Sequence, residues 1–129
     1  MKFLVVEDDF VSRNLLVRYL RKYGESDVAV NGREGLDIYK LEVEEKRSYD
    51  LIFLDIMTPE MDGMEFLEEI RKFEKEKGIL GMNGAKIVMT TALGDMDHVK
   101  KAFRYQVESY LIKPIEVSKI EEIIKGITE

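Results

Sequence analysis

The chain has 129 residues, of which 45% are hydrophobic and 36% are charged. This length and balance suit one soluble globular domain and exclude a disordered chain. The net charge of −6 argues against direct binding to nucleic acid, because phosphate backbones need clustered Lys and Arg. There is no cysteine, which excludes disulfides and thiolate metal sites, and no apolar run reaches the roughly 18 residues that a membrane span needs. We therefore expect a cytoplasmic protein that binds neither nucleic acid nor membrane.

Apolar runs that are typical of strands alternate with helical patterns along the chain. Residues 3–6 form the first apolar run, and the helical pattern after it starts at Asp9 as N-cap and stops at Gly24. Residues 27–30 predict a short second strand, and Asn31 is placed to cap a second helix. The positions that these two helices should bury are Val11, Leu15, Leu16, Tyr19, Leu20, Tyr23, Leu36, Tyr39 and Val43.

The rest of the chain repeats this alternation. Residues 51–54 predict the third strand, 87–89 the fourth and 110–112 the fifth. Pro and Gly mark 57–63 as a loop, and glycines mark 78–84 as another. The helical patterns that follow these three strands should bury Phe66, Leu67, Ile70, Phe73, Met96, Val99, Ala102, Phe103, Val117, Ile120, Ile124 and Ile127.

The strand pattern predicts the fold class. The runs are almost continuously apolar, as expected for a parallel sheet that helices cover on both faces. Five such strand–helix units in a chain of this length indicate an α/β, doubly wound, five-stranded parallel sheet with five helices, which is the flavodoxin-like class. We favour the strand order 2-1-3-4-5. It places at the edge the second strand, which alone lacks a reactive residue after its carboxyl end.

Polar residues follow the other four strands. The first strand leads into the acidic residues 7–9, the third ends in Asp55, the fourth in Thr90 and Thr91, and the fifth in Lys113. The carboxyl ends of parallel strands meet at one edge of an open α/β sheet, where ligands bind. The sequence therefore predicts a divalent metal site beside a carboxylate that can accept a phosphoryl group.

The same segments resemble the receiver domains of two-component response regulators. They are Val-Val-Glu-Asp-Asp at 5–9, Leu-Asp-Ile-Met-Thr-Pro-Glu-Met-Asp-Gly at 54–63, Thr-Ala at 91–92 and Lys-Pro at 113–114. The resemblance covers essentially the whole chain and implies a single receiver domain over 1–129, with no effector domain. The order 2-1-3-4-5 is itself known for a chemotaxis member of the family, so that expectation is not independent of the resemblance.

The resemblance implies a role for each residue of the predicted site. Asp55 would be the phosphoacceptor, and Asp8 and Asp55 would bind Mg²⁺, or Mn²⁺ in its place, directly. Glu7 would act on the metal through water, and the backbone carbonyl of Met57 would complete the protein ligands. Lys113 would neutralise a phosphoryl oxygen, and its bond to the following proline would be cis, as is typical of receivers.

The resemblance also implies a switch and its partners. The hydroxyl of Thr91 would contact the phosphoryl group, and the ring of Tyr110 would follow it in a shift between two packings. A histidine kinase or a phosphotransfer protein would supply the phosphoryl group. The signal would leave through the face built from the fourth helix, fifth strand and fifth helix, to an output protein that the sequence does not identify or to a phosphorylation-dependent dimer.

Three residues and one loop distinguish this chain from typical receivers or refine its expected function. Gln106 stands where receivers usually have glycine, in a turn that favours a left-handed conformation, and the loop 78–84 is longer than usual. The resemblance also implies that Met57 and Leu93 occupy the two positions that in receivers flank the approach of water to the phosphoryl group. Neither side chain orients water, so we expect slow self-dephosphorylation at most.

Two other functions are weighed against the switch. A magnesium-dependent phosphohydrolase would also use an aspartyl phosphate, but it normally has a second aspartate two residues later, where this chain has Met57. A flavodoxin-like FMN binder would need a loop rich in Ser, Thr and Gly after the first strand, where the acidic residues 7–9 would instead repel phosphate. We therefore expect a switch, not an enzyme.

Overall fold

The structure, a computed structural model, describes residues 1–57, 60–92 and 96–128. It contains a five-stranded sheet in the order β2-β1-β3-β4-β5, with every neighbouring pair parallel. The strands are β1 (Lys2–Val6), β2 (Glu25–Ala29), β3 (Leu51–Asp55), β4 (Ile87–Thr91) and β5 (Ser109–Ile112). The helices are α1 (Phe10–Leu20), α2 (Gly32–Glu44), α3 (Gly63–Glu76), α4 (Met96–Ala102) and α5 (Val117–Thr128), with short 3-10 turns η1 (Gly81–Asn83) and η2 (Phe103–Tyr105). The predicted fold class and strand order are confirmed.

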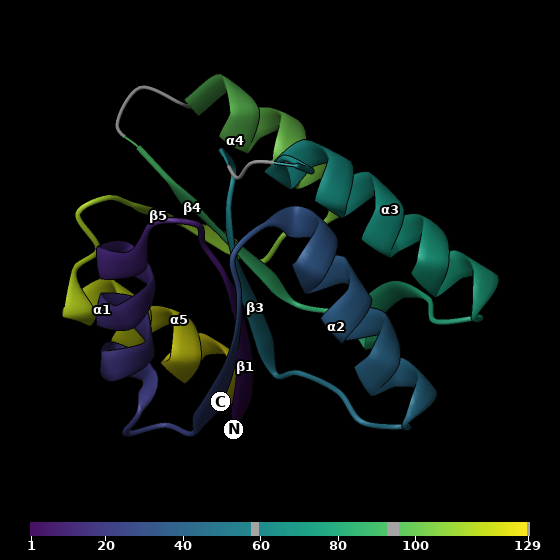
Figure 1. The fold of residues 1–129 in the computed structure, drawn as a ribbon, viewed down its shortest axis with the longest axis horizontal. Helices are drawn as coiled ribbons and strands as arrows, with labels where there is room; N and C mark the ends of the chain where they lie inside the picture. The colour runs from purple at the N-terminus through teal and green to yellow at the C-terminus, as the bar shows by residue number, and fades with distance from the viewer. Residues whose placement is uncertain (58–59, 93–95, 129) are drawn as a thin grey trace.

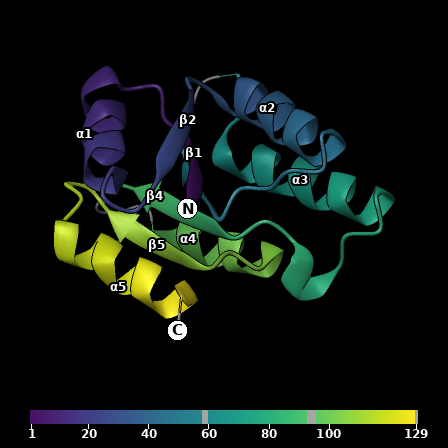
Figure 2. The ribbon, with the colours of Figure 1, turned by 90° about the horizontal axis from the view of Figure 1, so that it is seen from below.

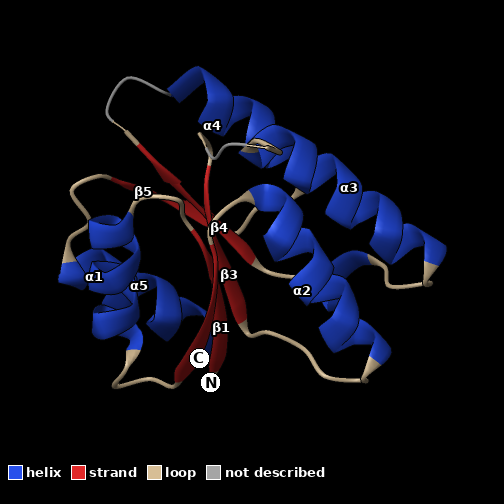
Figure 3. Ribbon diagram, viewed as in Figure 1, coloured by secondary structure: helices blue, strands red, loops and turns tan. Residues whose placement is uncertain are grey.

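Helices cover both faces of the sheet. Figure 1 shows α1 and α5 on one face and α2, α3 and α4 on the other, and Figure 3 shows the strands as the layer between them. Side chains of β1 alternate between the two sides, because successive residues of a strand point to opposite faces. Phe3 and Val5 pack with α1 and α5, whereas Leu4 and Val6 pack with α2 and α3. This explains why the central strands read as unbroken apolar runs.

The edge strand β2 differs from its predicted bounds. It begins at Glu25, two residues earlier than the pattern suggested, and ends at Ala29. Figure 2 shows it beside β1, where the Glu25 N–H donates to the Met1 carbonyl at 3.1 Å. Most of its side chains are exposed or half-buried, so main-chain pairing defines the strand and hydrophobicity does not. Gly24 lies just before it, and α1 ends earlier, at Leu20.

Some helical positions that the sequence assigned to the core lie at the surface. Val11 is 69% exposed, Val117 40% and Phe103 46%. Val11 and Val117 stand in the first turn of α1 and of α5. Phe103 belongs to η2 and not to α4, and the side chain of Met96 lies outside the described part of the chain.

Side-chain caps start three helices just after strands or loops of the carboxyl edge. Asp9, Asn31 and Asp62 accept hydrogen bonds from the N–H groups of Ser12, Glu34 and Glu65. Such caps satisfy N–H groups that have no partner inside the helix. They fix where each helix leaves the strand ends, and so they fix the shape of this edge. Among the described residues, no helix is long and apolar enough to cross a membrane.

Candidate metal centre at the carboxyl edge of the sheet

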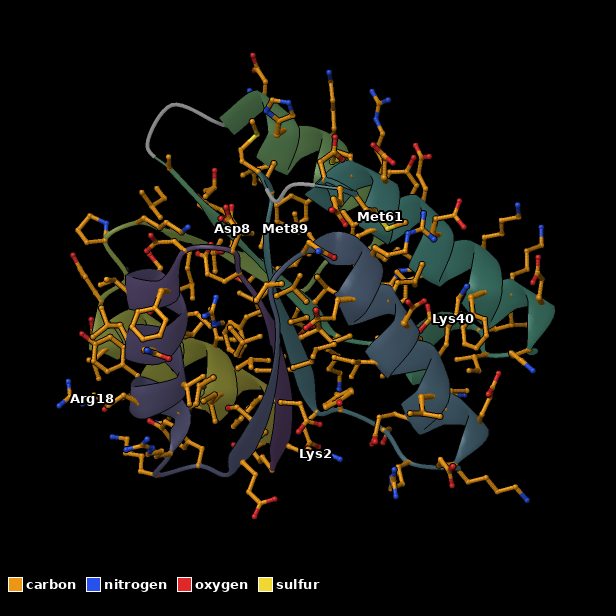
Figure 4. The ribbon with its side chains drawn as sticks, in the orientation of Figure 1. Lys2, Asp8, Arg18, Lys40, Met61 and Met89 are labelled. Carbon is orange, nitrogen blue, oxygen red and sulfur yellow. The ribbon has the colours of Figure 1, made fainter. Side chains whose placement is uncertain are left out.

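Strand register brings the predicted site residues to one edge. Val6 pairs with Leu54, Asp55 with Thr90, and Thr91 with Ile112, so the residues that follow these strands emerge side by side. The Glu7 N–H donates to the Ala29 carbonyl at 3.0 Å, and the Lys113 N–H to the Thr91 carbonyl at 2.8 Å. Figure 4 labels Asp8 at this edge and Lys2 near the opposite one.

Three carboxylates meet there. One ligand oxygen from each of Glu7, Asp8 and Asp55 lies within 4.8 Å of the other two. Glu7 and Asp55 are buried, whereas Asp8 is exposed. Oxygen ligands with one open side fit magnesium, which keeps several waters and uses few carboxylates. These residues therefore fit the predicted metal site.

Lys113 bridges two of these acids. Its ammonium donates a short hydrogen bond to Glu7 Oε1 and another, of 3.0 Å, to Asp55 Oδ2. The other oxygen of Asp55, Oδ1, accepts the Met57 N–H at 3.0 Å. Both oxygens of the Asp55 carboxylate are therefore oriented by donors. The Lys113–Pro114 bond is cis, as the resemblance implied.

Burial and the close acids separate the pKa values of the two buried carboxyls. Burial first, and then the neighbouring Asp55, raise the pKa of Glu7 to about 7, although Lys113 acts in the opposite sense. Burial also works against the charged form of Asp55, but hydrogen bonds from Glu7, the Met57 amide and Lys113 outweigh it and lower the pKa of Asp55. As pH falls towards neutral, Glu7 is therefore the carboxyl that takes up a proton, while Asp55 stays ionised.

Of the two predicted switch residues, Thr91 lies next to this cluster and Tyr110 lies farther along the sheet, on β5. Thr91 is buried at the end of β4, and its hydroxyl donates to the Ala92 carbonyl at 3.2 Å. Tyr110 is half-buried on β5 and packs its ring edge-to-face against Phe103, with centroids 6.4 Å apart. Its position among the core side chains next to α4 fits either a structural or a switching role.

One residue of the site was missed by the sequence analysis. Arg13, in the first turn of α1, donates from Nη1 to the carbonyls of Glu7 and Asp8 at 3.1 and 3.3 Å. It holds the backbone of the acidic turn without touching the carboxylates. A basic residue one helical turn after an acidic loop was the available signal.

Replacing Glu7 by Gln should change how stability depends on pH. In the presence of a chelator, the raised pKa means that folded Glu7 binds its proton more tightly than the unfolded chain does, so this contribution is lost as pH rises from about 4.5 to about 7. Glu7→Gln does not titrate, so it should match the wild type near pH 5 and be more stable by about 2 kcal/mol near pH 8. Urea unfolding at both pH values is the measurement.

A matched control is Glu69→Gln, at an exposed position on α3, which should track the wild type at both pH values. If Glu7→Gln is instead less stable than the wild type near pH 8, the pairing of ionised Glu7 with Lys113 stabilises the fold, which contradicts a raised pKa for Glu7.

Comparison with known proteins agrees with this geometry. Residues 3–125 match the family described as response regulator receiver domain. Chemotaxis protein CheY of Treponema pallidum (strain Nichols) is 34% identical over 98% of this chain and 81% of its own length. Chemotaxis protein CheY of Halobacterium salinarum is 32% identical over 96% of this chain and 93% of its own length.

A solved structure is similar as well. It is a co-crystal of the Saccharomyces cerevisiae histidine phosphotransfer signaling protein Ypd1 and the receiver domain of its downstream response regulator Ssk1. The matched chain is 30% identical with a TM-score of 0.80, over 94% of this chain and 83% of that one. With its sheet order, its acidic cluster and these relatives, the chain belongs to the response regulator receiver domains of two-component signalling.

Proposed function

We propose that this receiver domain is a phosphorylation-dependent switch that accepts a phosphoryl group on Asp55. The observation that carries the proposal is the environment of this carboxylate. It ends β3, keeps a lowered pKa although it is buried, and has Lys113 on one oxygen and the Met57 amide on the other. An ionised, oriented carboxylate is a nucleophile for phosphorus.

The transfer uses residues whose places are described above. An oxygen of Asp55 attacks the phosphorus of a phosphohistidine, the bond from phosphorus to the histidine nitrogen breaks, and an acyl phosphate forms. A magnesium or manganese ion held directly by Asp8, Asp55 and the carbonyl of Met57, and by Glu7 through water, would neutralise phosphoryl oxygens during transfer. Lys113 already reaches Asp55 Oδ2, so its ammonium can pair with a phosphoryl oxygen that replaces this contact.

The switch step begins at Thr91. Its hydroxyl is bonded at 3.2 Å to the carbonyl of Ala92, a neutral acceptor. A phosphoryl oxygen on Asp55 is charged and therefore a stronger acceptor, so phosphorylation favours a packing in which the hydroxyl turns towards Asp55. Tyr110 then repacks, and the balance between two conformations of the face formed by α4, β5 and α5 shifts. On this face Phe103, Ile112 and Val117 are exposed by 46%, 38% and 40%, and an output protein or a second copy docks there.

The donor is a protein of the histidine kinase or phosphotransfer class. Phe10 and Val11 begin α1 directly after the acidic turn, and they are 66% and 69% exposed. Two large apolar side chains at the rim of a charged site favour a protein surface as the donor over a small phosphodonor alone. The similarity to the Ssk1 receiver domain, crystallised with a phosphotransfer protein, supports this class.

Asp55→Asn should abolish phosphorylation while the fold persists. With acetyl phosphate and Mg²⁺, the wild type should gain the mass of one phosphoryl group by intact-mass measurement, and a chelator should prevent the gain. Asp37→Asn, at an exposed position on α2, is the control and should be modified as the wild type is. An undiminished adduct in Asp55→Asn would assign the phosphoacceptor elsewhere.

Replacing the apolar rim should separate protein donors from small ones. Phe10→Gln combined with Val11→Gln removes apolar docking area without adding charge. The rate of phosphotransfer from phosphorylated Ypd1 should fall about tenfold, whereas the rate with acetyl phosphate should stay unchanged. Leu41→Gln, which alters an exposed apolar residue on α2, should affect neither rate. Equal loss with both donors would mean that the rim shapes the site and does not dock the donor.

The phosphorylated state should be long-lived. Hydrolysis needs a water in line with the phosphorus, and the Met57 side chain, 62% exposed beside Asp55, offers no strong hydrogen bond to orient one. Met57→Asn should speed decay after donor removal about tenfold. Leu93, the second flanking position, lies outside the described residues, and Leu93→Glu would be added as a second step. Met82→Asn, at another exposed methionine, is the control. An unchanged decay with Met57→Asn and Leu93→Glu together would show that these side chains do not set the lifetime.

A further inference from the structure

Helix α3 is fastened to the turn that precedes β5. Arg71 donates from Nε to the Tyr105 carbonyl at 2.8 Å and from Nη2 to the Gln106 carbonyl at 3.1 Å. One helical turn earlier, Glu68 accepts the hydroxyl of Tyr105 at 2.9 Å. Three hydrogen bonds from two residues of α3 therefore hold η2 and the residue after it. None of these residues belongs to the phosphorylation site.

The fastened turn contains a left-handed residue. Gln106 has φ 61° and ψ 48°, a conformation that side chains other than glycine adopt at a cost. The two carbonyls that Arg71 binds lie on either side of the Gln106 Cα, so the guanidinium bonds to the residue whose backbone conformation is the least favourable of the turn. These hydrogen bonds offset the conformational cost of Gln106, a cost that glycine would not have at this position.

Arg71 is itself held in place from the other side. Its Nη1 donates to Glu74 Oε1 at 2.7 Å, and the Glu74 side chain is only 4% exposed. The second oxygen of Glu74 accepts the Tyr39 hydroxyl at 2.7 Å and the Ala85 N–H at 2.6 Å. The guanidinium is therefore fixed between a buried carboxylate and the turn. The long loop 78–84 contributes to this arrangement, because it delivers Ala85 to Glu74.

The fastened segment touches the proposed switch. Phe103 is the first residue of η2, and its ring packs at 90° against the ring of Tyr110. A fixed η2 keeps this ring where Tyr110 now packs. Edge-to-face pairs of this kind are favourable beyond the area they bury, so they favour this packing of Tyr110 over another.

We propose that Arg71 is a positioning residue of the switch: by fastening η2 to α3, it holds Phe103 against Tyr110 and opposes the repacking that phosphorylation drives. The inference rests on the proposed function of Asp55 and Tyr110 and adds a restraint on the side of the fold away from the metal ligands. Hydrogen bonds from a charged donor are among the stronger ones in proteins. The loss of these hydrogen bonds should therefore change the ratio between the two packings of Tyr110 by about tenfold.

The test compares Arg71→Met with Lys75→Met. The first keeps most of the aliphatic stem and removes every donor, and the second removes a cation from an exposed position on the same helix. Amide spectra of the wild type without and with beryllofluoride and Mg²⁺ define two positions for the Tyr110 signal. Without beryllofluoride, the Arg71→Met signal should lie on the line between these positions, displaced towards the second, and the Lys75→Met signal should coincide with the wild type.

Hydrogen exchange tests the fastening without any phosphoryl mimic. The Gln106 N–H bonds to Phe103 and the Glu108 N–H to Ile87, and both should exchange about tenfold faster in Arg71→Met. Arg71→Lys, whose single ammonium cannot replace the fork of donors, should give a smaller displacement on the same line. If Arg71→Met fails to fold, the displacement of the Tyr110 signal in Arg71→Lys tests the role of Arg71 in its place.

The outcomes separate this inference from the function on which it rests. If the wild-type Tyr110 signal does not respond to beryllofluoride, the proposed switch is wrong, whatever the variants do. If it responds but the Arg71→Met signal stays in place or leaves the line, Arg71 does not position the switch, even if exchange is faster. Equal displacement in Lys75→Met would likewise overturn the inference, because it would reflect charge and not the hydrogen bonds.

Discussion

The ammonium of Lys113 between Glu7 and Asp55 is the contact on which the carboxyl edge depends. Three carboxylates within 4.8 Å would repel one another, and this lysine is the cation that bonds to two of them. It can do so only with this sheet. Lys113 follows β5, whereas Asp55 ends β3 and Glu7 follows β1, and β4 lies between β5 and β3. The long lysine side chain and the two acidic side chains together span these strand ends when the ends are aligned, and the register provides that alignment. The contacts of Lys113 therefore depend on both the strand order and the register of the sheet.

The opposite edge of the sheet shows that the cluster is not a by-product of an acidic chain. There the buried Glu42 is paired with Lys2 at 2.9 Å and Arg47 at 3.0 Å, and hydrogen bonding to Lys2 lowers its pKa. At the carboxyl edge the pKa of Glu7 is raised instead, because its burial and a second acid exceed what one lysine compensates. Away from the predicted metal site, the buried Glu42 therefore has two cations as partners. The excess of negative charge lies where a divalent metal would relieve it.

The sequence predicted what depends on strand ends, and it did not predict what depends on long side chains between distant elements. Asp55, Thr91 and Lys113 follow apolar runs, so a parallel sheet places them without knowledge of any other contact. The left-handed turn at Gln106 could be suspected from the residue type, and the structure has φ 61° there. The contacts of Arg71 join residues 34 and 35 positions apart in the sequence, and no local pattern indicates such a bond. The start of β2 at Glu25 was missed for a related reason, because main-chain pairing extends a strand whose side chains are mostly polar.

A conformational switch needs one segment that moves easily beside one that is held in place. The face of α4 and β5 has both, in α4 and η2. α4 has only seven residues, and of its described side chains Val99 and Ala102 are buried. Few buried apolar groups mean that moving it exposes little area, so its displacement costs little free energy. η2 follows directly and is bonded to α3 through Arg71 and Glu68. A conformational change at Thr91 would then displace the short helix α4, whereas η2 would keep its position against α3. If Tyr110 switches as proposed, the same restraint would add to the free energy that phosphorylation must supply, because the ring of Phe103 that meets Tyr110 stands on the fixed side.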